Sequence, residues 1–389
     1  MALRFGNTEV AFRSKSDAAL RRSDWLFRAF GHPWFVRTGT GAMRAAFALH
    51  LPIAGLVKAT VFRQFVGGES IDECKPTIDA LWHHKVGTIL DVADEGGTDE
   101  AAFDATCAEV ERTIELAAGN PAIPFCVFKV SGLARFALLA KLDAGETLSE
   151  GEQGEWQRAQ ARVERLCAKA HAKGVRIMLD AEESWIQDAI DGLATTMMAR
   201  FNTERAIVLN TIQMYRTGRV QFLRDSHQRA MAGGYWLGLK LVRGAYMEKE
   251  RARAAQVGIP SPIQPDKAAS DAAYDEALRY CTANAERIAV VAGTHNEAST
   301  LLLTELMEKA GLRRDDPRFF FSQLLGMSDH LSFNLAAEGY NVAKYVPYGP
   351  VRAVVPYLTR RAEENTSISG QVGRERALIL EERKRRKSR

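Results

Sequence analysis

The stretch "WLGLKLVRGAYMEKERARA" (236–254) joins an apolar run, a short turn containing glycine, and a charged helical segment. This order is typical of one strand–helix unit of a parallel sheet. Eight apolar runs of this kind recur over about 260 residues, which matches the size of a (β/α)8 barrel. The other seven runs are "VGTILDVAD" (86–94), "IPFCVFKVSG" (123–132), "VRIMLDAEE" (175–183), "AIVLNTIQMY" (206–215), "RIAVVAGTHN" (287–296), "FFFSQLLGM" (319–327) and "YNVAKYVPYG" (340–349).

Each of the eight runs begins apolar and ends in a residue with a polar or charged side chain. The active site of a (β/α)8 barrel lies at the C-terminal ends of its strands, so one shared site would explain this pattern. Polar residues are common at strand ends near solvent, which would explain one or two of these positions. It does not explain Lys129 and Asp180 well, because both lie within apolar sequence. The residues at the ends are Asp91, Lys129, Asp180, Gln213, Arg243 with Tyr246, His295, Gln323 and Tyr345.

The segment "YLTRRAEEN" (357–365) follows the eighth run. As a helix, it places Tyr357, Arg360, Arg361 and Glu364 on one stripe, which in most helices is apolar and faces the core. Two adjacent guanidinium groups can converge on one anion, and their planar forks suit a carboxylate. A solvent-exposed face with ordinary ion pairs would give the same spacing. We expect this last helix to cap the barrel mouth.

Lys129 and Asp180 come from neighbouring strand ends, where buried charges must pair or become neutral. They form either a structural ion pair or part of a charged site suited to a zwitterion such as an amino acid. The single His295 is weak support for a metal, and the five cysteines include no C-x-x-C pair. We therefore predict reduced, structural thiols and no metal site.

The net charge of +4 is concentrated at the ends of the chain. Residues 381–389 hold six of the 52 basic and two of the 48 acidic residues, so the remainder carries 46 of each. This neutral body argues against nucleic-acid binding. We divide the chain into an N-terminal helical segment (1–70), the barrel (71–372) and a basic C-terminal tail (373–389).

The N-terminal segment carries ten Lys and Arg against four Asp and Glu, with aromatic residues between them. It is either a helical cap on the barrel or a surface that lies on a membrane. Its longest apolar stretch (45–62) is broken by His50, Pro52 and Lys58, which makes it a poor membrane span. The residues after Met1 do not resemble a secretory signal, so we expect a cytoplasmic protein.

Seven segments, in order, resemble the proline dehydrogenase (proline oxidase) family over roughly residues 65–370. The sequences of these segments are more similar to those of the separate, mitochondrial-type enzyme than to the domain of the bifunctional proline utilization A proteins. "YVPYGP" followed by "YLTRRAEEN" is especially specific. The segments are "LDAEE", "KLVRGAYMEKERA", "DKAASDAAYDEAL", "THN", "QLLGMSD", "KYVPYGPV" and "YLTRRAEEN".

The resemblance implies an α/β fold, a distorted (β/α)8 barrel that holds non-covalent FAD at its mouth. It implies oxidation of L-proline to Δ1-pyrroline-5-carboxylate, the first step of proline catabolism, with electrons passed to a membrane quinone. A quinone is lipid-soluble, so the protein is expected to be peripheral to the inner membrane, on the matrix side in a eukaryote. The basic, aromatic residues 1–65 and the tail are the expected docking surfaces.

The resemblance also implies roles for individual residues. Arg360 and Arg361 would hold the proline carboxylate, with Lys129 nearby and Asp180 in the adjoining polar network. Lys240 stands where many members of the family have arginine, and Lys267 would contact the pyrophosphate. Residues implied to wall the proline ring are Tyr246, Leu324, Tyr345 and Tyr357. Residues implied to contact the flavin are Gln213, Lys240, Val242, Arg243, Gly244, Ala245, Thr294, His295, Asn296 and Glu364.

Two other enzyme functions remain open at this point. A hydroxyproline dehydrogenase of the same family would accept a hydroxyl at ring carbon C4, which Tyr345 is expected to crowd. A (β/α)8 lyase would use Lys129 as a Schiff base and the arginine pair for a substrate carboxylate. The lyase would be colourless, whereas the flavoprotein would be yellow.

Overall fold

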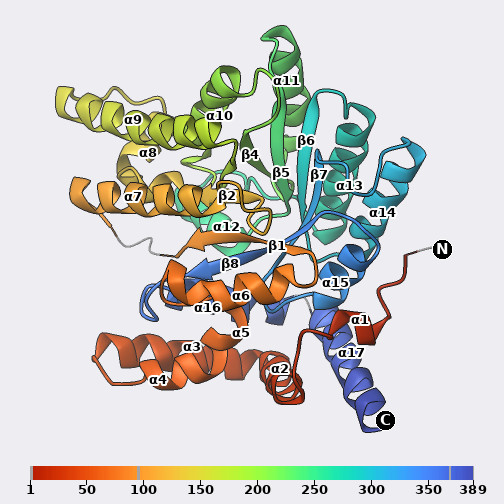
Figure 1. Ribbon diagram of the computed structural model, residues 1–389. Helices are drawn as coiled ribbons and strands as arrows, with labels where there is room; N and C mark the ends of the chain where they lie inside the picture. Colours follow the sequence, from red (N-terminus) through yellow and green to blue (C-terminus); the bar gives the residue numbers. More distant parts are fainter. Residues whose placement is uncertain (1–2, 94–96, 368, 389) are drawn as a thin grey trace. The chain divides into compact units, whose positions relative to one another are not determined.

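The eight apolar runs form a parallel β-sheet. The computed structural model describes residues 3–93, 97–367 and 369–388, with no description of the side chains at 33, 35, 44, 47, 48 and 363–372. The strands follow one another in sequence order as a closed barrel (Figure 1), so the predicted (β/α)8 fold is confirmed. The strands are β1 (Val86–Val92), β2 (Phe125–Phe128), β3 (Arg176–Leu179), β4 (Val208–Gln213), β5 (Leu237–Val242), β6 (Ile288–Gly293), β7 (Phe319–Leu324) and β8 (Val342–Tyr348).

The observed strands are shorter than the runs that predict them, mainly at their C-terminal ends. Lys129, Asp180 and Arg243 each lie one residue beyond a strand, and His295 lies two residues beyond β6. The buried part of each run forms the strand, and its polar end begins the following loop. The predicted positions at strand ends hold for Lys129, Asp180, Gln213 and Arg243, whereas Tyr345 lies in the middle of β8.

The chain divides into two compact units, which we describe separately. The first unit contains residues 1–94, 295–297 and 323–389. It includes β1 and β8, which pair in parallel from Val86 opposite Val342 to Val92 opposite Tyr348. The second unit contains residues 95–294 and 298–322, with β2 to β6 and most of β7. Our sequence-based boundaries at residues 70 and 372 stay predictions.

Helices alternate with the strands, as the amphipathic segments predict. Helix α9 starts with a capping box between Ser149 and Glu152 and ends at Gly174, whose φ of 68° is left-handed. The helices of the second unit are α7 (Glu100–Ala117), α8 (Phe136–Asp143), α9 (Glu150–Lys173), α10 (Gln187–Phe201), α11 (Arg219–Ala232), α12 (Met247–Val257), α13 (Lys267–Ala283) and α14 (Glu297–Lys309), with a 3₁₀ turn at Val130–Gly132.

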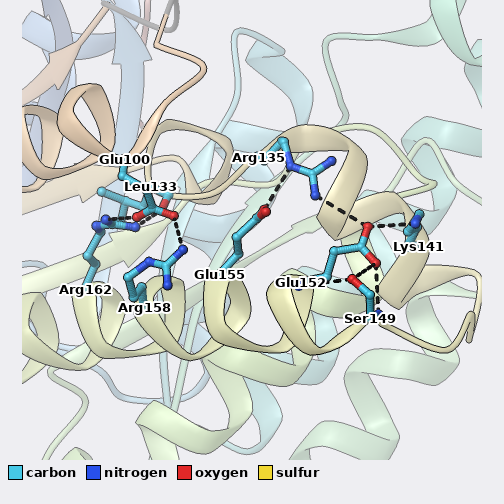
Figure 2. Close-up of polar contacts among 9 residues, drawn as sticks. All are labelled: Glu100, Leu133, Arg135, Lys141, Ser149, Glu152, Glu155, Arg158 and Arg162. Atoms are coloured by element: carbon cyan, nitrogen blue, oxygen red, sulfur yellow. Dashed lines mark hydrogen bonds and ion pairs between the residues drawn. The ribbon is translucent and has the colours of Figure 1, made fainter.

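Ion pairs fasten the polar helix α9 to its neighbours α7 and α8 (Figure 2). Arg162 on α9 is buried; it donates from Nε to Asp104 at 2.7 Å and also pairs with Glu100 of α7. Glu152 accepts from Lys141 of α8 at 2.7 Å. Because Arg162 is desolvated while its partners are partly exposed, these contacts fix the packing of α9 rather than provide a ligand site.

The first unit holds the terminal helices. Its core includes a cluster of aromatic side chains from α2, the π-helical turn, α5 and α16, among them Phe27, Phe30, Phe62, Phe65 and Tyr357. No described helix is both long and apolar enough to cross a membrane. The helices are α1 (Thr8–Ala11), α2 (Asp17–Phe30), α3 (Pro33–Ala48), α4 (Ala54–Val57), the π-helical turn Lys58–Phe62, α5 (Arg63–Phe65), α6 (Ile71–Trp82), α15 (Asp329–Ala337), α16 (Val355–Ser367) and α17 (Ser369–Lys387).

The basic tail forms most of α17, and much of its charge is paired within the first unit. Arg383 and Arg376 both bind Asp24 of α2, the latter at 3.0 Å. Arg386 donates to Asp17 at 2.8 Å and to the carbonyl oxygen of Phe12 at 2.9 Å. These contacts hold α17 against the N-terminal helices, so many of its basic groups already have protein partners.

Candidate functional site

The candidate residues form two groups, one on each compact unit. The second unit carries the ends of β2 to β6, and the first unit carries β8, α16 and the segment 295–297. Each group has its own contacts, which are described below unit by unit.

An ion pair links two candidate residues of the second unit. The Lys240 ammonium on β5 binds the Asp180 carboxylate directly after β3. Their side chains are 6% and 14% exposed, respectively. A buried charge needs a partner, and Lys240 and Asp180 supply each other with one. Lys129 also lies directly after its strand, at the start of the turn Val130–Gly132.

Glu182 is a buried carboxyl group that the sequence analysis did not select. Its carboxylate accepts hydrogen bonds from the amide of Ser131, at 2.9 Å, and from the Ser131 hydroxyl. Burial raises the pKa of Glu182 to about 7, against the Ser131 bonds and the positive charge of Lys129. The signal was present in "LDAEE", where a carboxylate follows the strand end by three residues.

Gln213 at the end of β4 has one side-chain atom without a protein partner. Its amide nitrogen donates to the carbonyl oxygen of Glu182 at 2.8 Å. This bond leaves Oε1 of Gln213 buried with no hydrogen-bond partner among the described residues. Buried acceptors in native structures are normally satisfied. The atom is therefore suited to accept a hydrogen bond from a bound ligand.

Arg243 is held in one orientation by four neighbours. Its guanidinium donates to Asp271 at 2.6 Å, to the Thr294 hydroxyl at 2.7 Å and to the Ser299 hydroxyl at 2.9 Å. It also lies 4.4 Å from the centre of the Tyr274 ring. Asp271 in addition binds Lys267. A fixed guanidinium followed by exposed backbone suits a polar or anionic group of a ligand.

Gly244 follows Arg243 in a conformation that requires glycine. Its φ is +142°, and an added Cβ would lie 2.3 Å from the Tyr215 ring. Gly244 and Ala245 are exposed, whereas Val242 and Tyr246 are half-buried. The absence of a side chain at Gly244 lets the Tyr215 ring pack directly against the backbone. The small residues after β5 thus leave peptide groups accessible beside the fixed arginine.

In the first unit, α16 turns one of its two adjacent arginines inward. Arg361 is 6% exposed, and its guanidinium lies 5.1 Å from the centre of the Tyr357 ring one turn earlier. Arg360 is half-buried, and Tyr345 on β8 is buried. A solvent-exposed salt-bridge face would not bury Arg361, so that alternative does not fit this position. The side chain of Glu364 lies outside the described residues.

His295, Asn296 and Leu324 complete the group on the first unit. Nδ1 of His295 is 2.9 Å from the hydroxyl of Ser328, within hydrogen-bond distance. Leu324 is partly buried against the core, and its carbonyl oxygen accepts from Lys344 at 3.3 Å. Asn296 is half-buried. The segment after β6 and the loop after β7 are therefore joined by a side-chain hydrogen bond.

These features define a (β/α)8 barrel with buried charged and hydrogen-bonding groups at the C-terminal ends of its strands, the arrangement of an enzyme of this fold. The chain belongs to the proline dehydrogenase family, because the model described as "Proline dehydrogenase" matches residues 74–374, well over half of its length.

Several characterised proteins are similar to the chain over much of its length. A carbapenem antibiotics biosynthesis protein, CarD, from Pectobacterium carotovorum subsp. carotovorum is 35% identical over 83% of the chain and 83% of CarD. Human "Proline dehydrogenase 1, mitochondrial" is 42% identical over 61% of the chain and 40% of that protein. A hydroxyproline dehydrogenase from Xenopus laevis is 31% identical over 99% of the chain and 90% of the relative.

The fold is also similar to that of solved bifunctional proteins. The crystal structure of proline utilization A from Bdellovibrio bacteriovorus, inactivated by N-propargylglycine, superposes with a TM-score of 0.72 at 22% identity. The match covers 81% of the chain and 34% of that protein. The chain thus spans about a third of the bifunctional protein and less than half of the human relative, and the structural match supports the fold alone.

Proposed function

We propose that the protein oxidises L-proline to Δ1-pyrroline-5-carboxylate with non-covalent FAD and passes the electrons to a membrane quinone. Family membership supports proline as the substrate class. The observation that carries the proposal is the buried guanidinium of Arg361 against the Tyr357 ring on α16. It provides a cation beside an apolar surface, as an amino acid with a small carbon ring requires.

The residues of the second unit fit a flavin. The unsatisfied Oε1 of Gln213 supplies an acceptor, and flavin rings carry an N–H donor. The exposed backbone after Arg243 suits a large planar or phosphate-bearing cofactor. When bound, FAD accepts the hydride that proline loses. Residues proposed to hold it are Gln213, Lys240, Val242, Arg243, Gly244, Ala245, Thr294, His295, Asn296 and Glu364, with Lys267 at the pyrophosphate.

The substrate is proposed to be oriented through its carboxylate. Arg360 and Arg361 would bind it as a fork, with Lys129 nearby, so that the ring adopts one pose. Tyr246, Leu324, Tyr345 and Tyr357 would form the wall around the ring and exclude water. The proline nitrogen must be unprotonated before C5 loses hydride, since its lone pair forms the new C=N bond.

Asp180 is proposed to receive the amine proton, and Lys240 is proposed to stabilise the negative charge that develops in the reaction. Asp180, whose carboxylate binds Lys240, is proposed to accept the amine proton through the polar network. Lys240 would place positive charge near the cofactor, where negative charge develops during reduction. Lysine is a point charge and arginine a planar fork, so Lys240 differs in geometry from the arginine of many relatives.

Contact with a membrane is proposed because the acceptor is lipid-soluble. Residues 25–68 include five Lys and Arg and no Asp or Glu. Four apolar side chains in α3, α4 and the segment between them are at least half exposed: Trp34, Leu49, Leu51 and Leu56. A basic and apolar segment complements an anionic lipid surface, although Lys58 is already paired with Glu69 and Glu73. The protein would then be cytoplasmic, or in the matrix of a eukaryote, and peripheral to the inner membrane.

Hydroxyproline oxidation is the second candidate, favoured by the Xenopus laevis relative, which matches 99% of the chain. The position that discriminates is Tyr345, which is buried on β8. Its ring is proposed to crowd carbon C4 and disfavour a hydroxyl there. The Schiff-base lyase, with Lys129 as the nucleophile, has less support because the family model matches an oxidoreductase family.

Turnover with an artificial electron acceptor tests the proposal. We expect faster turnover per enzyme of L-proline than of trans-4-hydroxy-L-proline, with Δ1-pyrroline-5-carboxylate as the product. Faster turnover of hydroxyproline would favour the second candidate. Reaction of an amino acid without reduction of the acceptor would favour the lyase.

A further inference from the structure

The loop that follows β7 is held by side chains from both ends of the chain. Gln64 of α5 donates to the carbonyl oxygen of Gly326 at 2.9 Å. Lys344 of β8 donates to the carbonyl oxygens of Leu324 and Met327. These contacts come from segments far apart in sequence, and together they fix the backbone between β7 and α15.

Glu375 of α17 supplies a further contact to this loop. Its Oε1 accepts a hydrogen bond from the backbone amide of Ser328 at 2.9 Å. Glu375 is 2% exposed. Ser328 has a φ of 51°, a left-handed conformation that is costly for a residue with a side chain. The buried hydrogen bond from its amide to Glu375 stabilises Ser328 in this conformation.

Ser328 in turn contacts a candidate cofactor residue. Its hydroxyl lies 2.9 Å from Nδ1 of His295, in the segment after β6. The conformation of Ser328 sets where this hydroxyl points. A chain of two hydrogen bonds therefore runs from the Glu375 carboxylate, through Ser328, to the His295 ring.

Charged groups surround Glu375 from three other elements. Asp329 at the start of α15 lies between Lys344 of β8 and Lys15, whose ammonium groups are 2.7 and 2.8 Å away. Burial raises the pKa of Glu375 to about 7, as does Asp329, whereas the Ser328 amide, Lys15 and Lys344 oppose the rise. Either protonation state retains a carbonyl-type oxygen that can accept from Ser328.

We propose that Glu375 is a positioning residue that fixes Ser328 and, through it, the ring of His295. The inference rests on the proposed function where it concerns FAD, because His295 is proposed to contact the flavin. It adds a role for Glu375, which lies one residue beyond the family match to residues 74–374. Helix α17, formed mostly by the basic tail, would then help to hold the His295 ring in place.

The test compares Glu375→Ala, Glu375→Gln and the matched control Glu382→Ala. Glu382 is also buried on α17, where its carboxylate binds Thr8, Arg385 and Arg386. Holoenzymes are compared by FAD dissociation constant, and histidine-labelled proteins by the NMR resonances of His295 with and without FAD.

Glu375→Ala is expected to weaken FAD binding about tenfold, the effect of losing one buried hydrogen bond, and to shift the His295 resonances. Glu375→Gln keeps the acceptor and is expected to stay within about twofold of wild type. Glu382→Ala is expected to lower the melting temperature without moving either the FAD affinity or the His295 resonances.

A lower melting temperature in Glu375→Ala with unchanged His295 resonances and FAD affinity would overturn the inference, because that is the result of a merely structural role. If the alanine variant does not fold, Glu375→Asp, which withdraws the carboxylate by one methylene, takes its place with the same expected result. If the wild-type protein binds no FAD, the proposed function fails, while the His295 resonances still test the positioning role.

Discussion

Arg361 places a positive charge in the interior of the first unit. The group is almost fully buried and lies against the Tyr357 ring. A buried cation is costly unless it has a partner. The Tyr357 ring is one neighbour of this guanidinium, and the substrate carboxylate is proposed to bind beside it.

Replacing Arg361 by methionine tests this role. We expect the KM for proline to rise by an amount corresponding to about 2–5 kcal/mol, because a buried charged contact is lost, while FAD is retained. Steady-state kinetics and the flavin absorbance measure the two effects. Arg352→Met, at an exposed position before the same helix, is the control and should leave KM unchanged. An unchanged KM in Arg361→Met would refute the carboxylate role.

Glu182 is expected to make stability depend on pH. Its folded pKa of about 7 lies above the unfolded value near 4.5, so the folded state binds the extra proton. The stabilisation is complete below pH 4.5 and is lost as pH rises through 7, a change of about 3 kcal/mol for this group. Glu375 acts in the same direction, since its pKa is also about 7.

Glu182→Gln should therefore reduce the loss of unfolding free energy between pH 5 and pH 8 without abolishing it. Urea unfolding at the two pH values measures the difference. Glu164→Gln, at a side chain 44% exposed in an ion pair with Arg200, serves as the control. The same pH dependence in wild type and Glu182→Gln would contradict the assignment.

At the scale of elements, periodicity and apolar runs predicted the strands well. They could not predict which side chains form ion pairs with each other. The runs identified all eight strands because each is a short apolar segment followed by a helix. The pairing of Asp180 with Lys240 joins residues 60 apart in sequence, and no local pattern encodes it. Glu182 was missed because one carboxylate among three near a strand end looks like ordinary loop polarity.

The basic tail shows the same limit. Its charge predicted a separate surface segment, yet Leu378, Ile379 and Glu382 of α17 are buried. Glu382 accepts a hydrogen bond from Thr8, 374 residues away in sequence. Composition describes which residues are present, whereas their burial depends on α1 and α2 packing against them. We therefore place the proposed membrane contact on α3, α4 and the segment between them rather than on the tail.

The double variant Leu51→Glu/Leu56→Glu tests this surface. Both side chains are at least half exposed, so the folded protein should tolerate the change. We expect loss of co-sedimentation with vesicles that contain anionic lipid, because apolar area is removed and the positive charge of the surface is reduced. Turnover with a soluble acceptor should remain.

Val257→Glu/Ile259→Glu provides the matched control on the second unit, since these side chains are similarly exposed and lie outside the proposed surface. Equal loss of vesicle binding in both double variants would point to net charge alone. Vesicle binding that persists after the change at Leu51 and Leu56 would remove α4 and its preceding segment from the proposed surface.

At the scale of the whole molecule, the fold was predictable because a (β/α)8 barrel repeats one unit eight times. The candidate residues were less predictable, since those of each compact unit come from several separate segments of the chain. The sequence named Arg361, Gln213 and Arg243, but their burial and contacts required coordinates. Sequence similarity gives the family, whereas the FAD-dependent reaction of this chain stays a proposal.

The visible absorption spectrum of the purified protein, recorded under anaerobic conditions before and after L-proline is added, tests the central claim most directly. We predict a flavin band near 450 nm, a typical flavin absorbance, that bleaches when proline reduces the cofactor. A colourless protein, or a flavin band that proline does not bleach, would contradict the claim.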